Sequence, residues 1–173
     1  MLIGTFQHSL DAKGRLFIPA KLREELGERF VITRGTGGCL FGFSHEQWET
    51  FTEKLRALPL GDPNAQRVVR LLSAWATEVE LDKQGRALLS ANLRECAGLG
   101  KEATIIGATN RIEIWDRSTW EAYKSKEDIG YDEAMSRYLR STGRDAIAEA
   151  ADAVAEHLRA DDHVLENPAD YYD

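Results

Sequence analysis

The sequence has few cysteines, few prolines and no long hydrophobic run. Two cysteines and four prolines occur among its 173 residues, and Cys39 and Cys96 lie in neither a CxxC pair nor a histidine-containing pattern. Neither a disulfide framework nor a metal site is therefore expected. No stretch approaches the roughly 18 consecutive apolar residues of a membrane span, and the first residues do not resemble a signal peptide. We expect a globular protein that stays in the cytoplasm and does not enter a membrane.

The sequence also lacks an excess of positive charge, because its formal net charge is −7. Such a balance argues against a nucleic-acid partner, since neutralising phosphates requires lysine and arginine. The negative charge is, however, concentrated at one end. Residues 145–173 contain nine acidic residues and one arginine, whereas residues 1–144 contain 21 basic and 20 acidic residues. A near-neutral body can still gather basic side chains on one face, so the charge does not exclude local DNA binding.

An internal repeat organises the chain. Shifting the sequence over itself by 71 positions places residues 11–15 (DAKGR) on residues 82–86 (DKQGR) and residues 20–24 (AKLRE) on residues 91–95 (ANLRE). Two copies are too few for a solenoid. We therefore expect an α+β protein made of two duplicated units that pack on each other as a pseudo-dimer.

The repeat also predicts how the chain is divided. Residues 1–76 form a first unit with connecting helices, residues 77–130 a second unit, and residues 131–173 a helical, acidic extension. Apolar side chains at helical spacing on both sides of Gly143 predict two helices in this extension. Its last residues, from about 161 onward, combine many acids with no apolar periodicity and are expected to be disordered.

Each copy shows the same order of local signals. Apolar and polar side chains alternate over residues 6–10 and 77–81, which predicts a half-buried strand before each motif. Asp-x-x-Gly predicts a tight turn, because aspartate can accept hydrogen bonds from the backbone that follows and glycine adopts a positive φ. A second strand, a short helix ending near Gly27 or Gly98, and a hairpin follow.

Two further helices are predicted in the first unit. Ser44 suits the N-cap of one helix, and Asp62 precedes another. In the second of these helices, four apolar side chains are expected to face inward: Val68, Val69, Leu72 and Trp75. Four residues are expected in the core, because such side chains are most often buried: Leu22, Leu93, Trp48 and Trp120.

The arginine that ends each motif is the candidate reading head for DNA. A planar guanidinium can form two hydrogen bonds with O6 and N7 of guanine, and Arg15 and Arg86 directly follow a rigid turn. A plainer alternative is that these arginines pair with Asp11 and Asp82, or with neighbouring carboxylates, at the surface, where such pairs contribute little. The motifs alone leave both roles open.

The other residues of the motifs have simpler expected roles. Asp11 and Asp82 are expected to shape the turns together with the turn glycines. Lys13, Lys21 and Arg23 are candidates for phosphate contacts, which fix the register of a protein on DNA without reading the base sequence.

The motif segments resemble the MraZ family of bacterial transcriptional regulators. The resemblance is carried by residues 4–8 (GTFQH), residues 11–23 (DAKGRLFIPAKLR) and the second Asp-x-x-Gly-Arg motif, and it covers roughly residues 1–140. It implies an AbrB-like swapped-hairpin β-barrel unit in each half, with flanking helices and a pseudo-two-fold axis within the chain. It also implies a nucleoid-associated repressor of the division and cell-wall gene cluster. Such a repressor binds short G-rich promoter repeats as a ring-shaped homo-oligomer, an octamer or a dodecamer.

By position, the resemblance assigns DNA contacts to both motifs. These contacts comprise Lys13, Gly14, Arg15, Gly85 and Arg86. The second motif departs from the first, because Gln84 stands at the position of Lys13 and Ser90 at the position of Pro19, and its lysine, Lys83, lies one place earlier. We therefore expect the second copy to bind DNA more weakly, or through Arg86 and Lys83 together.

Two other classes of function compete with DNA binding. An acidic tail on an AbrB-like domain also fits an antitoxin-like protein that binds a partner, although such antitoxins usually carry one hairpin unit per chain. An enzyme is disfavoured, because the histidines His8, His45, His157 and His163 are scattered and the glycine-rich segment 35–38 has no Lys-Ser/Thr pair after it. No catalytic residue, cofactor, metal or small-molecule substrate is therefore expected.

Overall fold

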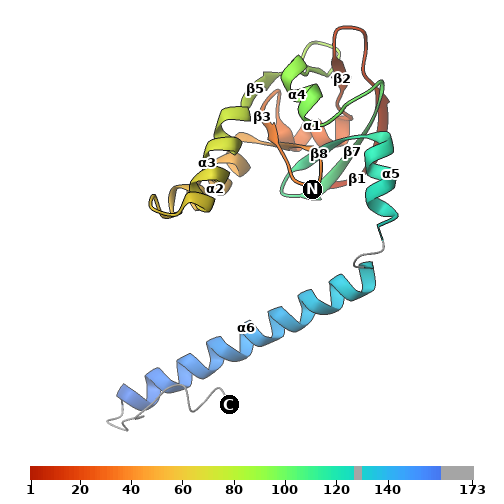
Figure 1. The fold of residues 1–173 in the computed structure, drawn as a ribbon. Helices are drawn as coiled ribbons and strands as arrows, with labels where there is room; N and C mark the ends of the chain where they lie inside the picture. Colours follow the sequence, from red (N-terminus) through yellow and green to blue (C-terminus); the bar gives the residue numbers. More distant parts are fainter. Residues whose placement is uncertain (127–129, 161–173) are drawn as a thin grey trace. The chain divides into compact units, whose positions relative to one another are not determined.

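The computed structural model describes residues 1–126 and 130–160. Residues 1–125 form one compact unit, here called unit 1, and the residues from 126 onward belong to a second, unit 2 (Figure 1). Unit 1 contains both motifs, whereas unit 2 contains the helix α6 (Tyr131–Ala160). The terminal segment predicted to be disordered, residues 161–173, lies outside the described residues.

Both copies in unit 1 follow the same order of elements, and the first copy has one additional helix at its end. The first copy contains β1 (Leu2–Ser9), β2 (Arg15–Phe17), α1 (Ala20–Leu26), β3 (Arg29–Arg34), β4 (Leu40–Phe43), α2 (His45–Arg56) and α3 (Pro63–Trp75). The second copy contains β5 (Thr77–Glu80), β6 (Arg86–Leu88), α4 (Ala91–Cys96), β7 (Glu102–Thr109), β8 (Ile112–Asp116) and α5 (Arg117–Lys124). The α+β class with duplicated units is thus confirmed.

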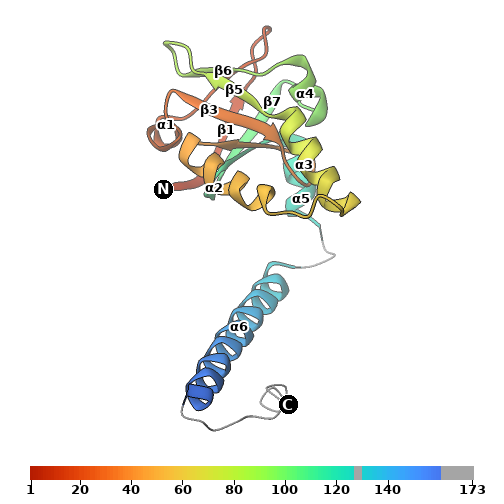
Figure 2. The same cartoon turned by 90° about the vertical axis from the view of Figure 1, so that its left-hand side faces the viewer.

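The sheets interleave the two copies (Figure 2). A six-stranded antiparallel sheet has the order β1-β7-β8-β4-β3-β5, and β2 and β6 form a separate two-stranded ribbon. The hairpins β3–β4 and β7–β8 are local, but the first strand of each copy pairs with the other copy, β1 with β7 and β5 with β3. The equivalent strands of the two copies are β1 and β5, β3 and β7, and β4 and β8. Replacing each strand by its equivalent gives the same strand order in reverse, as the expected pseudo-two-fold symmetry requires.

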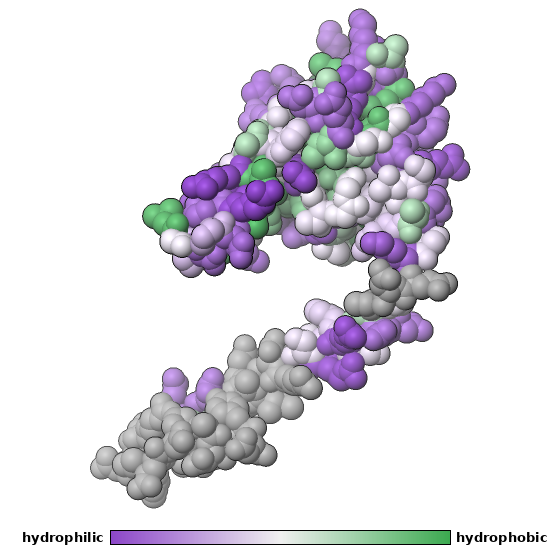
Figure 3. All heavy atoms as spheres, viewed as in Figure 1, coloured by the Kyte–Doolittle hydropathy of each residue, from purple (hydrophilic) through white to green (hydrophobic). Residues whose placement is uncertain are grey.

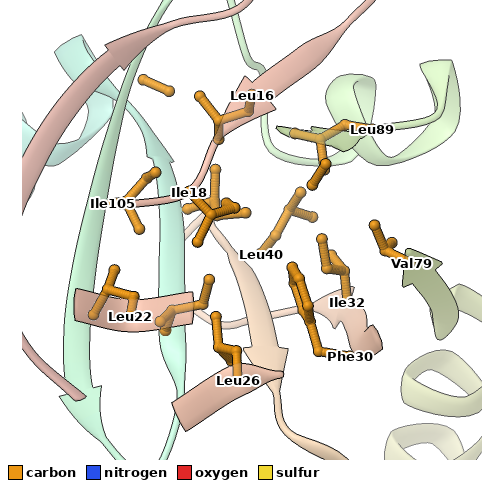
Figure 4. Packing of buried hydrophobic residues seen from close by; sticks show 14 of the residues in the cluster. Leu16, Ile18, Leu22, Leu26, Phe30, Ile32, Leu40, Val79, Leu89 and Ile105 are labelled. Atoms are coloured by element: carbon orange, nitrogen blue, oxygen red, sulfur yellow. The ribbon is translucent and has the colours of Figure 1, made fainter. Parts of the chain in front are cut away.

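One hydrophobic core is shared by both copies. It receives equivalent side chains from each: Leu16 and Ala87, Ile18 and Leu89, Leu22 and Leu93. Figure 4 shows Leu16, Ile18 and Leu89 converging with Ile105 and Leu40. Burying each large apolar side chain stabilises the fold by about 1.5–3 kcal/mol. Because residues 16 and 18 point into this core, the alternation of the ribbon places Arg15 on its other, more exposed side.

Side-chain caps begin several of the helices. Backbone N–H groups donate to Ser44 Oγ at α2 (3.2 Å), to Asp62 Oδ1 at α3 (2.9 Å) and to Ser90 Oγ at α4 (3.3 Å). Each such bond satisfies an N–H that the first helical turn leaves without a partner and stabilises the helix by about 1 kcal/mol. The cap predicted at Ser44 and the helix predicted after Asp62 are confirmed.

Two tryptophans that were expected in the core lie outside it. Trp48 and Trp120 are only partly buried, against a second, smaller cluster. Its buried members are Cys39, Phe41, Phe43 and Trp115. The contacts are equivalent in the two copies, because the ring of Trp48 lies 5.7 Å from that of Phe43 and the ring of Trp120 lies 5.3 Å from that of Trp115. Each indole also contacts an aromatic ring of its own helix, Phe51 or Tyr123, and remains partly exposed, as is common for so large a side chain.

Helix α3 is less covered than predicted. Val68, which was expected to face inward, is 47% exposed. It lines an open groove of about 540 Å3 whose apolar walls include Phe41, Phe43 and Phe51. Because this side of α3 borders a groove and not another element, its apolar face is only partly buried. Figure 3 shows apolar residues interrupting the hydrophilic surface over α2 and α3.

In unit 2, helix α6 is continuous from Tyr131 to Ala160. The break predicted at Gly143 is therefore wrong. Glycine is only about 1 kcal/mol less favourable than alanine inside a helix, and the many alanines and other good helix formers of this segment outweigh that difference. Within the described ranges of the chain, no helix is both long enough and apolar enough to cross a membrane.

Candidate nucleic-acid interface

The first Asp-x-x-Gly-Arg motif forms a hydrogen-bonded turn. Asp11 Oδ1 accepts hydrogen bonds from the backbone N–H groups of Lys13 (3.0 Å) and Arg15 (2.8 Å). Gly14 N–H donates to the Asp11 carbonyl oxygen (3.0 Å), and Gly14 has a φ of 82°. A residue with a Cβ atom is strained at this φ, so the turn depends on both the carboxylate and the glycine.

The second motif repeats this geometry. Asp82 Oδ1 accepts hydrogen bonds from the N–H groups of Gln84 (2.9 Å) and Arg86 (2.9 Å). Gly85 N–H donates to the Asp82 carbonyl oxygen (3.0 Å), and Gly85 has a φ of 77°. Both turns project from the same end of unit 1, at the top of Figure 1 and Figure 2. The structure thus brings the two candidate reading heads to one surface.

Each motif arginine is oriented by the aspartate of its own turn. Arg15 Nε donates to Asp11 Oδ2 at 2.6 Å, and Arg86 Nε donates to Asp82 Oδ2 at 2.8 Å. The two arginine side chains are 31% and 27% exposed. The pairing described above as the plainer alternative therefore occurs. It is compatible with DNA reading, because a bond at Nε fixes the plane of the guanidinium while its Nη groups retain hydrogens to donate.

The first aspartate also faces the arginine of the second copy. Asp11 Oδ2 lies 3.6 Å from Arg86 Nη1, and the antiparallel ribbon sets Phe17 opposite Arg86. Hydrogen bonds from the backbone and side chain of Arg15 lower the pKa of Asp11, and those from Arg86 lower the pKa of Asp82. Both carboxylates are therefore ionised at neutral pH, and Asp11 links the two turns electrostatically.

The remaining motif residues differ in accessibility. Lys13, Lys21 and Lys83 are exposed, as phosphate contacts require. Gly14 and Gly85 are buried, which favours a role for both glycines in the shape of the turns.

Arg23 lies against the second turn. A Cβ atom placed on Gly85 would lie 2.6 Å from Arg23 Nη1, and Arg23 Cζ lies 5.4 Å from the centre of the Phe17 ring. Arg94, which was not among the predicted site residues, covers Gly14 in the same way. The alignment of AKLRE with ANLRE in the repeat is the signal that could have identified Arg94, because it places this residue on Arg23.

His8 and Cys39 of unit 1 are engaged in packing. The His8 ring lies 5.1 Å from that of Phe17, and burial raises the pKa of the Cys39 thiol to about 12. A thiol with so high a pKa is a poor nucleophile at neutral pH. Among the described residues, no three or more His, Cys, Asp or Glu side chains are grouped to hold a metal ion. The two Asp-x-x-Gly-Arg turns are therefore the clearest candidate site of unit 1.

Sequence comparisons agree with the duplicated motif. The family described as "MraZ protein, putative antitoxin-like" matches residues 1–71 and 72–141. A protein of Acetivibrio thermocellus named transcriptional regulator MraZ is 51% identical over 129 residues, which cover 75% of this chain and 90% of that protein. A Thermoanaerobacter sp. protein of the same name is 48% identical over 133 residues, which cover 77% of this chain and 93% of that protein. The resemblance is confirmed, and the chain belongs to the MraZ family.

Proposed function

We propose that this chain is a sequence-specific, DNA-binding transcriptional regulator. Two of its relatives carry the name transcriptional regulator MraZ. The observation that carries the proposal is the pair of arginines, Arg15 and Arg86, each held through Nε by an aspartate at the same end of unit 1. A guanidinium fixed in this way can donate to guanine with little further loss of side-chain entropy.

The polar residues of the turns have different tasks in this proposal. Arg15 and Arg86 read guanine, and one good bidentate contact gives about 1–3 kcal/mol of discrimination against a wrong base. Lys13, Lys21 and Lys83, all exposed, contact phosphates and add affinity that depends on salt but not on base sequence.

The first turn is the stronger reading head in this proposal. Lys13 is exposed beside Arg15, whereas the uncharged Gln84 takes the equivalent position in the second turn. The second turn therefore lacks a positive charge beside its arginine at this position, so it contributes less affinity.

The DNA target, the regulatory action, the location and the assembly are proposed from the family resemblance. The target is a set of short G-rich promoter repeats of the division and cell-wall gene cluster, the action is repression, and the protein is cytoplasmic and associated with the nucleoid. Because one chain supplies few contacts, tight specific binding requires several copies. A ring-shaped homo-oligomer would engage successive repeats and gain affinity through effective concentration. This function involves no catalytic step, cofactor or small-molecule substrate.

Substitution of the two arginines tests the proposal. Fluorescence anisotropy should show that Arg15→Ala removes the preference for a G-rich repeat duplex over a scrambled duplex in modest salt, and that Arg86→Ala weakens it less. Size-exclusion chromatography should show an unchanged oligomer for both variants. Arg70→Ala, which alters an exposed arginine of α3, is the matched control. If both motif variants keep the preference of the unaltered chain, the proposal is wrong.

An antitoxin-like interaction is the second candidate function. The family description contains this term, and residues 145–173 contain nine acidic residues and one arginine. Such a segment complements a small basic protein through its charge. Purification of the full chain and of a chain lacking residues 145–173 separates the candidates. A small basic protein that copurifies only with the full chain favours this second function, whereas binding of the G-rich duplex by both chains favours the first.

A further inference from the structure

Each turn glycine lies beneath an arginine that belongs to the other copy. A Cβ atom placed on Gly14 would lie 2.8 Å from Arg94 Nε and 2.9 Å from Arg94 Cζ. A Cβ atom placed on Gly85 would lie 2.6 Å from Arg23 Nη1 and 2.8 Å from Arg23 Cζ. Such distances leave no room for a side chain, so each guanidinium packs directly on the backbone of a glycine and buries it.

Backbone hydrogen bonds cross between the copies at the same two places. Leu89 N–H donates to the Gly14 carbonyl oxygen (2.9 Å), and Ile18 N–H donates to the Gly85 carbonyl oxygen (2.9 Å). Arg94 Nε donates to the carbonyl oxygen of Leu89 at 3.2 Å. Arg94 therefore packs on the first turn and is also hydrogen-bonded to Leu89, the residue whose N–H binds that turn at Gly14.

We propose that Arg94 is a positioning residue for the first turn and that Arg23 is a positioning residue for the second. Each side chain covers the open side of a turn that has no Cβ atom there, and so restrains the conformation in which Arg15 or Arg86 is presented. The dependence is crossed, because each turn relies on a helix of the other copy. The consequence for DNA rests on the proposed function, whereas the positioning itself does not.

The two positioning residues are anchored unequally. Arg94 Nε has the Leu89 carbonyl oxygen as acceptor, whereas Arg23 Nε is buried and has no hydrogen-bond partner among the described residues. Arg23 instead lies near the Phe17 ring, and a cation–π contact of this kind contributes modestly. Loss of Arg94 should therefore disturb its turn more than loss of Arg23 disturbs the other.

Hydrogen exchange of the protein alone tests the crossed dependence. Arg94→Met and Arg23→Met keep most of the side-chain length but remove the guanidinium, and Arg70→Met at an exposed site of α3 is the matched control. Exchange followed by mass spectrometry should rise about fivefold or more in residues 11–15 for Arg94→Met. It should rise in residues 82–86 for Arg23→Met, and in each variant the other turn should be unchanged.

Exchange in the β3–β4 hairpin reports whether a variant has lost global stability. If this hairpin also exchanges faster, the same exchange measurement is made on Arg94→Lys and Arg23→Lys. Lysine keeps the positive charge of arginine but not its planar guanidinium. Faster exchange in the turn of the same copy, in both turns equally or in neither turn overturns the proposal.

A double-mutant cycle tests the consequence for DNA. Arg94→Met and Arg15→Ala together should reduce affinity for the G-rich duplex by less than the product of their separate effects, by about threefold or more. Arg94→Met and Arg86→Ala should couple less strongly, because the first turn reaches Arg86 through the Asp11 contact at 3.6 Å. Coupling to Arg86 as strong as that to Arg15, or coupling to neither arginine, overturns the role in DNA binding. If the unaltered chain shows no preference for the G-rich duplex, the proposed function fails, and the exchange experiment still decides the crossed positioning.

Discussion

Asp11 and Arg86 belong to different sequence copies, yet Asp11 Oδ2 lies 3.6 Å from Arg86 Nη1. The same oxygen accepts a hydrogen bond from Arg15 Nε at 2.6 Å. One carboxylate thus restrains both motif arginines, whereas Asp82 pairs with the arginine of its own turn. Two motifs that share the pattern Asp-x-x-Gly-Arg therefore have unequal electrostatic surroundings.

The shared contact predicts that Asp11→Asn reduces base discrimination more than Asp82→Asn. Asparagine can still accept the backbone hydrogen bonds of the turn, but its neutral amide holds a guanidinium less firmly than a carboxylate does. We expect Asp11→Asn to lower the preference for the G-rich over the scrambled duplex by about tenfold, which is on the order of one bidentate contact. Anisotropy titrations with both duplexes measure this preference, and equal effects of the two substitutions would contradict the shared role of Asp11.

Acid should loosen both turns. Hydrogen bonds from the backbone of Arg15 and Arg86 lower the pKa of Asp11 and Asp82 below the ordinary value of 3.8. A pKa lowered by folding adds stability that is present above 3.8 and is lost as the pH falls through the lower, folded-state value. NMR shifts of the Lys13 amide should therefore titrate below pH 3.8 in the unaltered chain but not in Asp11→Asn. The same titration in both proteins would show that Asp11 is not its origin.

The turn glycines should resist substitution. Gly14→Ala places a Cβ atom at a φ of 82°, 2.8 Å from Arg94 Nε and 3.1 Å from the Leu89 carbonyl oxygen. We expect it to lower the free energy of unfolding by about 1–3 kcal/mol, measured by urea denaturation. Gly85→Ala should cost less, because its three nearest atoms all belong to the Arg23 side chain, whereas a Cβ atom on Gly14 also meets the backbone carbonyl oxygen of Leu89.

Gly61→Ala is the control for these glycine substitutions. A Cβ atom there would meet open space, with no described atom within 4 Å, and its effect should stay within about 0.5 kcal/mol. A loss of stability for Gly61→Ala equal to that of Gly14→Ala would show that close packing at the turn does not explain the cost.

The local parts of the fold could be predicted from the sequence, whereas the pairing between copies could not. Hairpins and caps such as that at Ser44 depend on residues close in the chain, so periodicity and capping rules identify them. The alternation in β1 shows that one face is half-buried, but it does not select β7 as the partner. Swapped pairing was expected only from the family resemblance. The exposure of Val68 likewise depends on a groove between elements, which helical periodicity does not describe.

The same division applies to the candidate site. The turn role of Asp11 and its pairing with Arg15 involve neighbours in sequence, and both could be stated before the structure was known. The contact between Asp11 and Arg86 and the packing of Arg94 on Gly14 depend on how β2 and β6 align. That register joins segments 71 positions apart in the repeat, and short-range patterns contain no information about it.

Removal of residues 145–173 should strengthen non-specific DNA binding. The deletion removes nine acidic residues and one arginine, and it changes the formal net charge from −7 to +1. An acidic segment repels the duplex and competes with phosphates for the basic side chains of the turns. We expect the affinity for the scrambled duplex to rise several-fold at low salt. The gain should shrink at high salt, because the Debye length falls from about 10 Å at 0.1 M to about 3 Å at 1 M.

A full-length chain in which the nine acidic residues of this segment are replaced by asparagine and glutamine separates charge from chain length. If charge is the cause, this chain should gain as much affinity for the scrambled duplex as the deletion does, with the same dependence on salt. A gain in the deletion alone would indicate that the segment blocks the turns sterically. Unchanged affinity in both chains at low salt would show that the acidic segment does not compete with DNA.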